Sequence, residues 1–86
     1  MKVHLPSPLD GYTGGVREVD LPGRNLGEVL AALDARFPGV RFRLVDEQDR
    51  IRPHISVFVN AEGCGDLAAP LGRKDEVRIV AALSGG

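Results

Sequence analysis

The N-terminal part of the chain alternates apolar and polar residues at the two-residue period of β-strands. The pattern predicts two strands, Lys2–Leu9 and Val16–Leu21, that pair as a hairpin. Asp10–Gly15 is expected to be the loop between them, because its glycines supply the positive φ angles that a chain reversal needs. The inward-facing residues of the two strands are Val3, Leu5, Val19 and Leu21.

A helical period follows the hairpin. Asn25 is a suitable N-cap, and Glu28 is expected to reach back to the Asn25 amide as in a capping box. Apolar residues then recur at helical spacing as one stripe: Leu26, Val29, Leu30, Leu33 and Phe37. Pro38-Gly39 ends the helix, because proline disfavours helical geometry in the residue before it. The pattern predicts one amphipathic helix of about three turns, with one face to bury.

The rest of the chain predicts two more strands, His54–Asn60 and Val77–Ala82. Before the first of them lies a charged, irregular segment, Val40–Arg52, expected to form a short helical turn. It is pinned to the domain by Phe42, Leu44 and Val45. Between the two strands, residues 61–73 form a glycine-punctuated connection anchored by Leu67 and Leu71.

The predicted order is strand, strand, helix, strand, strand. A sheet with one helix packed across one face is an α+β fold with two layers. The helix lies on the crossover from Val19 to Ile55, which is expected to be right-handed.

Composition limits the functions that the chain can perform. Its 86 residues suffice for one domain, and folding hides only about three-fifths of the surface at this size, which leaves no room for a walled catalytic cavity. The 11 basic and 12 acidic residues interleave without the basic stripe that nucleic-acid binding requires. A single cysteine, Cys64, excludes an internal disulfide and fits a reducing cytoplasm. No apolar stretch is long enough to cross a membrane, so we expect a soluble cytoplasmic protein.

The order of elements and several motifs resemble the ubiquitin-like β-grasp sulfur carriers of the MoaD/ThiS family. The likeness covers the whole chain, and the length and the insert before the third strand resemble the longer cysteine-pathway carriers. Two departures concern the turn at Ala61–Cys64 and the lack of a proline before the tail. The matching motifs are Asn25-Leu26-Gly27-Glu28-Val29-Leu30, Val57-Phe58-Val59-Asn60, Asp75-Glu76-Val77 and Ala81-Ala82-Leu83-Ser84-Gly85-Gly86.

The resemblance implies that the functional group is the carboxylate of Gly86. In this family an activating enzyme of the ubiquitin-activating type uses ATP to form an acyl-adenylate. A persulfide from a rhodanese or cysteine desulfurase then attacks, and the product is a thiocarboxylate that a downstream synthase consumes. The chain itself is then a carrier without catalytic residues, bound metal or bound cofactor. Residues 1–82 would form the β-grasp domain, and residues 83–86 a flexible tail.

Glycines suit such a tail because they lack Cβ atoms and pass through a narrow channel. The tail residues are Leu83, Ser84, Gly85 and Gly86, which reach about 13 Å when fully extended. A terminal Gly-Gly alone could equally be a frayed chain end. Its position directly after the last strand of a β-grasp pattern favours the functional interpretation.

The outward residues of the third and last strands predict a partner-binding surface. Phe58 and Val80 would lie on the open face of the sheet, with Arg78 and Arg52 at the rim. The alternative is that the Val40–Arg52 segment covers this patch.

Other chemistry-bearing residues carry less weight. His4 and His54 lack a third metal ligand and a nucleophile, and Cys64 has no basic neighbour to lower its pKa. Two further functions remain open: a protein modifier that forms isopeptide bonds with lysines through the same tail, and a β-grasp interaction subunit whose tail is inert.

Overall fold

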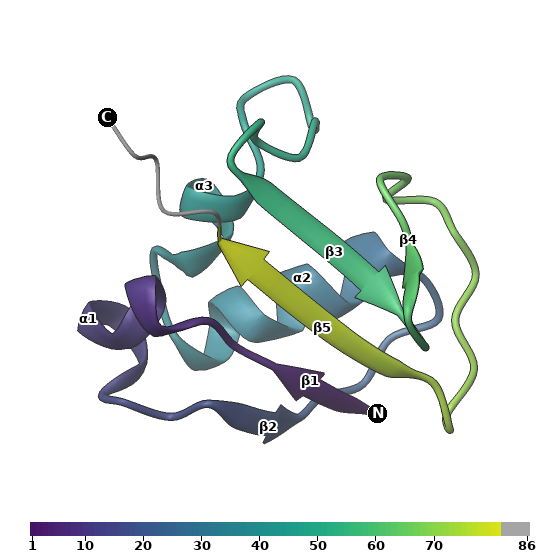
Figure 1. Ribbon diagram of the computed structural model, residues 1–86, viewed down its shortest axis with the longest axis horizontal. Coiled ribbons are helices and arrows are strands. Elements are labelled where there is room, and N and C mark those ends of the chain that lie inside the picture. Colours follow the sequence, from purple (N-terminus) through teal and green to yellow (C-terminus); the bar gives the residue numbers. More distant parts are fainter. Residues whose placement is uncertain (82–86) are drawn as a thin grey trace.

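The computed structural model describes residues 1–81 and contains a mixed five-stranded sheet in the order β2-β1-β5-β3-β4. β1 pairs with β2 antiparallel and with β5 parallel, while β3 pairs antiparallel with both β5 and β4. The last strand therefore lies at the centre of the sheet (Figure 1). The strands are β1 (Lys2–His4), β2 (Glu18–Asp20), β3 (Ile55–Val59), β4 (Glu62–Gly63) and β5 (Glu76–Ala81).

The main helix, α2 (Leu26–Arg36), lies across one face of the sheet (Figure 1). As predicted, Asn25 is its N-cap, and the Asn25 side chain accepts a hydrogen bond from the Glu28 amide at 2.8 Å. The Glu28 carboxylate reaches one residue further back than expected and accepts from the Arg24 amide at 2.9 Å. Phe37 lies just beyond the helix as its C-cap, half-buried against the core.

One continuous core fills the space between the sheet and the helices. The residues predicted to point inward from the strands are buried, apart from Val59 and Ala81, which are half-buried. The predicted α+β two-layer arrangement is therefore confirmed. The most completely buried residues are Val3, Leu26, Val29, Leu30, Leu33, Leu44, Val40, Val45 and Val77.

The first strand is shorter than predicted, and the expected loop after it is helical. The strand ends at His4, followed by a 3₁₀ turn, η1 (Ser7–Leu9), and a single α-helical turn, α1 (Asp10–Thr13). Pro6 and Pro8 explain the early end, because proline has no N–H for the sheet ladder and the fixed φ of Pro8 suits a helical first turn. Gly14 caps α1 in the left-handed conformation, at φ 66°.

The segment after α2 forms the predicted short helix, α3 (Val40–Leu44), which packs against α2. Leu44 and Val45 are buried as expected, but the expectation for Phe42 is wrong, because its side chain is 60% exposed. The helical period explains this: Val40 and Leu44 are four residues apart and share the buried face, whereas Phe42 points the other way.

The connection before β5 contains one element that the sequence did not reveal. β4 adds two residues to the sheet edge, pairing Phe58 with Gly63 and Val59 with Glu62. Leu67 and Leu71 anchor the connection as predicted, since both are partly buried against the core. Within residues 1–81, no helix is long and apolar enough to cross a membrane.

Candidate functional site

The predicted sulfur-bearing residue and its tail lie outside the described residues, which end at Ala81. Those predictions concern Leu83, Ser84, Gly85 and Gly86. The structure does describe the point from which the tail departs. Ala81 ends β5 and is paired in register with Ile55 of β3, so the tail begins from the central strand of the sheet.

The start of β5 is fixed by a polar turn built from two of the motifs found in the sequence. The Asn60 side chain accepts from the Glu76 amide at 2.9 Å and donates to the Asp75 carboxylate at 2.7 Å. Asp75 also accepts from the Gly72 amide at 2.7 Å. Hydrogen bonds from Gly72 first, and then from Asn60, lower the pKa of Asp75 below its ordinary value. These bonds join the end of β3 to the beginning of β5.

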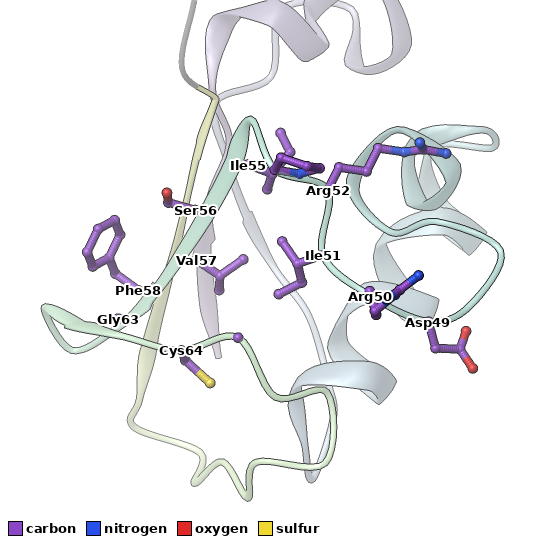
Figure 2. A pocket seen from close by; sticks show the side chains of 12 residues that line it. Asp49, Arg50, Ile51, Arg52, Ile55, Ser56, Val57, Phe58, Gly63 and Cys64 are labelled. Atoms are coloured by element: carbon purple, nitrogen blue, oxygen red, sulfur yellow. The ribbon is translucent and has the colours of Figure 1, made fainter.

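Phe58, Val80 and Arg78 lie where the sequence predicted, on the sheet face opposite the helices. In Figure 2 the side chains of Ser56 and Phe58 project to one side of β3, and that of Val57 projects to the other, toward the core. Val80 is 39% exposed and Phe58 is half-buried. Together they line a shallow pocket whose remaining residues are His4, Asn60, Ala61, Glu76 and Arg78.

The segment Val40–Arg52 does not cover this pocket, since α3 packs against α2 on the other side of the sheet (Figure 1). Arg52, which was expected at the rim, does not line this pocket, although it lines a neighbouring pocket together with Phe58 (Figure 2). Its side chain extends away from Phe58 (Figure 2), and its guanidinium lies 4.8 Å from the ring centroid of Phe42. Arg52 donates from Nε to the Phe42 carbonyl at 2.8 Å, which fixes this direction.

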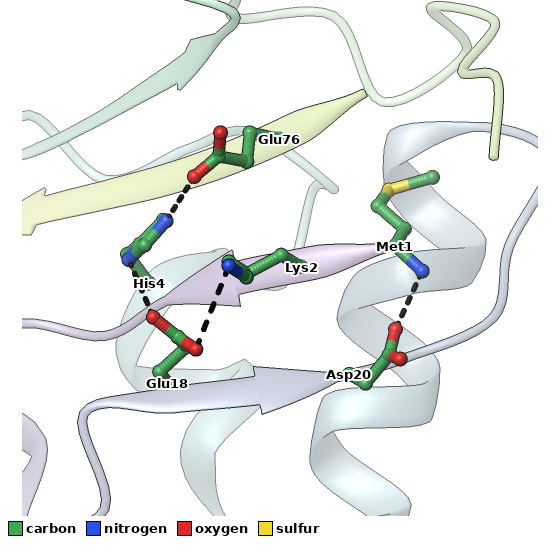
Figure 3. Close-up of polar contacts among 6 residues, drawn as sticks. All are labelled: Met1, Lys2, His4, Glu18, Asp20 and Glu76. Atoms are coloured by element: carbon green, nitrogen blue, oxygen red, sulfur yellow. Dashed lines mark hydrogen bonds and ion pairs between the residues drawn. The ribbon is translucent and has the colours of Figure 1, made fainter. Parts of the chain in front are cut away.

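A ladder of ionisable groups occupies the rest of the open face and was not foreseen from the sequence (Figure 3). His4 Nε2 contacts the Glu76 carboxylate at 2.5 Å, and His4 Nδ1 lies 3.7 Å from Glu18. The hydrogen bond with His4, reinforced by its charge, lowers the pKa of Glu76. Lys2 Nζ lies 3.8 Å from the Glu18 carboxylate. The open face is therefore charged over β1 and β2 and apolar between Phe58 and Val80.

The two-residue period of each strand does place these ionisable residues on its outward face, and this much could be read from the sequence. Which strands would be neighbours could not be deduced, because the pairing of β1 with β5 joins residues more than 70 positions apart, such as His4 and Glu76. At the edge of the ladder, the N-terminal ammonium contacts Asp20 at 2.6 Å and is the first cause of the lowered pKa of that carboxyl (Figure 3).

The remaining candidates form no site in the described part of the chain. His54 is exposed, and Cys64 is half-buried with its Sγ 3.8 Å from the Asp66 carbonyl. Within residues 1–81, no three His, Cys, Asp or Glu side chains gather in a way that could hold a metal ion.

Known proteins resemble the chain along nearly its full length. The model of the ThiS family matches residues 3–86. The sulfur carrier protein CysO of Mycobacterium tuberculosis (strain H37Rv) is 34% identical over 89 residues, which cover 98% of this chain and 96% of the relative.

Solved structures give the same fold. A chain of the Amycolatopsis orientalis BexX/CysO complex superposes with a TM-score of 0.89 at 32% identity, covering 99% of this chain and 98% of that one. SAMP1 of Haloferax volcanii superposes with a TM-score of 0.79 at 28% identity, covering 100% of this chain and 98% of that one. The predicted ubiquitin-like β-grasp fold is thereby confirmed.

Proposed function

The chain belongs to the ThiS family, and from this premise we propose that it is a sulfur carrier whose Gly86 carboxylate becomes a thiocarboxylate. Carriers of this family are substrates of partner enzymes and not catalysts. The relatives named CysO agree with the resemblance to the longer cysteine-pathway carriers. The observation that carries the proposal is that the family match extends through Gly86, five residues after the central strand ends at Ala81.

The C-terminal carboxylate of Gly86 is a poor acyl donor until it is activated. An α-carboxyl with an ordinary pKa of about 3.5 is fully ionised at neutral pH, and oxide is a bad leaving group. The carboxylate of Gly86 attacks the α-phosphorus of ATP, pyrophosphate leaves, and the product is an acyl-adenylate. ATP is bound by the activating partner, an adenylyltransferase of the ubiquitin-activating type.

Sulfur enters in the second step. The terminal sulfur of a persulfide, carried by a rhodanese or cysteine desulfurase, attacks the acyl carbon, and AMP leaves with the electron pair of the broken C–O bond. A further thiol attacks the donor protein's sulfur in the resulting acyl disulfide. This step releases the thiocarboxylate and leaves a disulfide on the donor side. A downstream synthase then accepts the sulfur.

The activating enzyme is proposed to dock on the open face of the sheet. The half-buried Phe58 ring and the exposed Val80 side chain supply apolar area, and Arg78 supplies a charge at the edge of the same pocket. The support for this surface is geometric, because Val80 lies on β5 next to Ala81, the last described residue before the tail.

Intact-mass analysis tests the proposal. The purified chain is incubated with the activating enzyme, ATP, cysteine and a cysteine desulfurase. We expect a gain equal to one oxygen-to-sulfur exchange, confined by fragmentation to Gly86. A chain lacking Gly86 is the control and should show no gain. The proposal fails if the intact chain keeps its mass while the enzyme loads another carrier of the family in parallel.

A second function has a specific observation in its favour. The small archaeal modifier protein 1 of Methanosarcina acetivorans superposes with a TM-score of 0.81 at 25% identity, covering 99% of this chain and 94% of that one. If the chain is also a modifier, digests of cell extract will contain branched peptides in which lysine bears Gly85-Gly86. An inert β-grasp subunit, the third possibility, gives neither the mass gain nor the branched peptides.

A further inference from the structure

Three of the chain's four aromatic residues gather around α3, each with an arginine guanidinium on its ring. Such pairs occur about once per 70–80 residues in folded proteins, so three within one short region exceed expectation. The pairs are Arg52 with Phe42, Arg43 with Tyr12 and Arg36 with Phe37, at 4.8, 5.9 and 5.7 Å from the guanidinium carbon to the ring centroid.

The pair of Arg52 and Phe42 is held by the backbone. Arg52 Nε donates to the Phe42 carbonyl at 2.8 Å, and the Arg52 amide donates to the Leu44 carbonyl at 3.0 Å. The Phe42 ring is nevertheless 60% exposed, more than any other large hydrophobic residue in the described chain. A fixed, exposed aromatic side chain is the kind of residue that anchors protein interfaces.

All three of these arginines also lack an ion-pair partner in the described part of the chain. Neither Arg43 nor Arg52 has a carboxylate within 4.0 Å among residues 1–81. Their neighbours differ, because Arg41 lies 3.2 Å from Asp49 and Arg50 lies 3.7 Å from Asp46. A guanidinium stacked on a ring keeps its edge N–H groups free to bind a carboxylate with two hydrogen bonds.

The location of this region relates it to the tail. Arg52 accepts a hydrogen bond at its carbonyl from the Ile55 amide at 2.9 Å, and Ile55 is the register partner of Ala81. In the view of Figure 1, the arrow of β5 points to the end of the domain at which α3 lies. Five residues follow Ala81, and five fully extended residues span at most about 18 Å. An enzyme that reacts with the Gly86 carboxylate must therefore bring the mouth of its active site close to this end of the domain.

We propose that Tyr12, Phe42, Arg43 and Arg52, which we call the aromatic–arginine patch, dock on an acidic rim around the active-site mouth of the enzyme that adenylates Gly86. This inference rests on the proposed function and adds a second contact to the open face. Phe42 fills an apolar pocket of the rim, and Arg43 and Arg52 bind its carboxylates. The tail would then leave the domain between two docking surfaces, the patch on one side and Phe58 with Val80 on the other.

Adenylation measured as ATP–pyrophosphate exchange tests the patch, with the purified adenylating enzyme and varied carrier concentration. We expect Phe42→Ala and Arg43→Glu each to raise the KM for the carrier about tenfold and to leave kcat unchanged, because they remove docking and not chemistry. Added salt should raise the wild-type KM and have less effect on Arg43→Glu. Arg73→Glu is the matched control, an exposed charge reversal in the connection before β5.

Three results would contradict the proposed docking of the aromatic–arginine patch. A KM within twofold of wild type for Arg43→Glu overturns the patch, as does an equal rise in Arg73→Glu or a fall in kcat alone. Arg43 makes no hydrogen bond to the described fold beyond its helix backbone, so this variant remains informative even if Phe42→Ala were to unfold. A chain without Gly86 separates the two proposals: if exchange persists in it, the proposed function fails and not the patch.

Discussion

Asn60 and Asp75 stand 15 positions apart and are joined by side-chain hydrogen bonds that close the turn between β3 and β5. Asn60 adopts a positive φ of 50°, a conformation that asparagine tolerates better than most residues. The sequence marks both residues as family motifs, but it does not say why they are there. The structure supplies the reason, since the Asn60 side chain accepts from the first amide of the central strand and Asp75 holds that side chain in place.

This turn predicts a pH dependence of stability. Because hydrogen bonds depress the folded-state pKa of Asp75 below its ordinary value of 3.8, the unfolded chain takes up the proton first as the pH falls. The carboxylate thus stabilises the fold above pH 4, and this contribution is lost as the pH falls through the lowered pKa. In urea titrations, Asp75→Asn should be less stable than wild type at pH 7, and the difference should shrink toward pH 3.

The matched control for Asp75→Asn is Glu47→Gln, which changes an exposed carboxylate that makes no side-chain hydrogen bond or ion pair within residues 1–81. Glu47→Gln should leave the pH dependence of the free energy of unfolding as it is in the wild type. A constant gap between wild type and Asp75→Asn from pH 7 to pH 3 would contradict the explanation.

Gly23 shows a second constraint at the scale of one residue. A Cβ built there would lie 2.5 Å from Val29 Cγ2 and 2.8 Å from the Val29 amide nitrogen. Gly23→Ala must displace the first turn of α2 and should cost about 1–3 kcal/mol in the free energy of unfolding. Gly65→Ala is its control, because a Cβ at Gly65 meets nothing within 4 Å. Equal stability of the two variants in urea would refute this view of Gly23.

At the scale of elements, the sequence predicted those whose signals are local. The α2 stripe and its N-cap lie within about three turns of chain, so periodicity and capping suffice to find them. β1 was predicted too long because Leu9 continues the apolar pattern although prolines have already redirected the backbone. β4 was missed because two residues, Glu62 and Gly63, carry no period and join the sheet only through their pairing with β3.

The N-cap of α2 offers a test at this scale. Asn25→Ala removes the acceptor of the Glu28 amide and should lower the free energy of unfolding by about 1 kcal/mol. Asn25→Asp retains an acceptor at the same position and should lose much less. Thermal unfolding followed by circular dichroism measures both, and a similar loss for the two variants would point to some other role of Asn25.

At the scale of the whole molecule, alternation along β5 divides the residues between two faces. Val77 and Ile79 enter the core under α2, whereas Arg78 and Val80 remain on the open face. This division was predictable from the two-residue period, and so was the position of Phe58. The charged half of that face was not, because its side chains come together only through the parallel pairing of β1 with β5.

The open face leads to a prediction about partner binding. Val80→Asp places a charge on the proposed docking surface and should weaken binding to the activating enzyme at least tenfold, measured by calorimetry. Val16→Asp is the control, since Val16 is similarly exposed, at 37% against 39% for Val80, and lies outside the pocket. Both variants should melt close to wild type. Unchanged affinity in a folded Val80→Asp variant would exclude this face.

The central place of β5 also has a mechanical consequence. When a partner protein binds the residues after Ala81 and pulls along β5, the force acts in shear on the hydrogen bonds of β5 to β1 and to β3 at the same time. Interstrand hydrogen bonds run across the strand, so all of them share a force along it. When an edge strand is peeled away, its hydrogen bonds break one at a time. The domain should therefore resist unfolding when a partner protein pulls on its C-terminal tail.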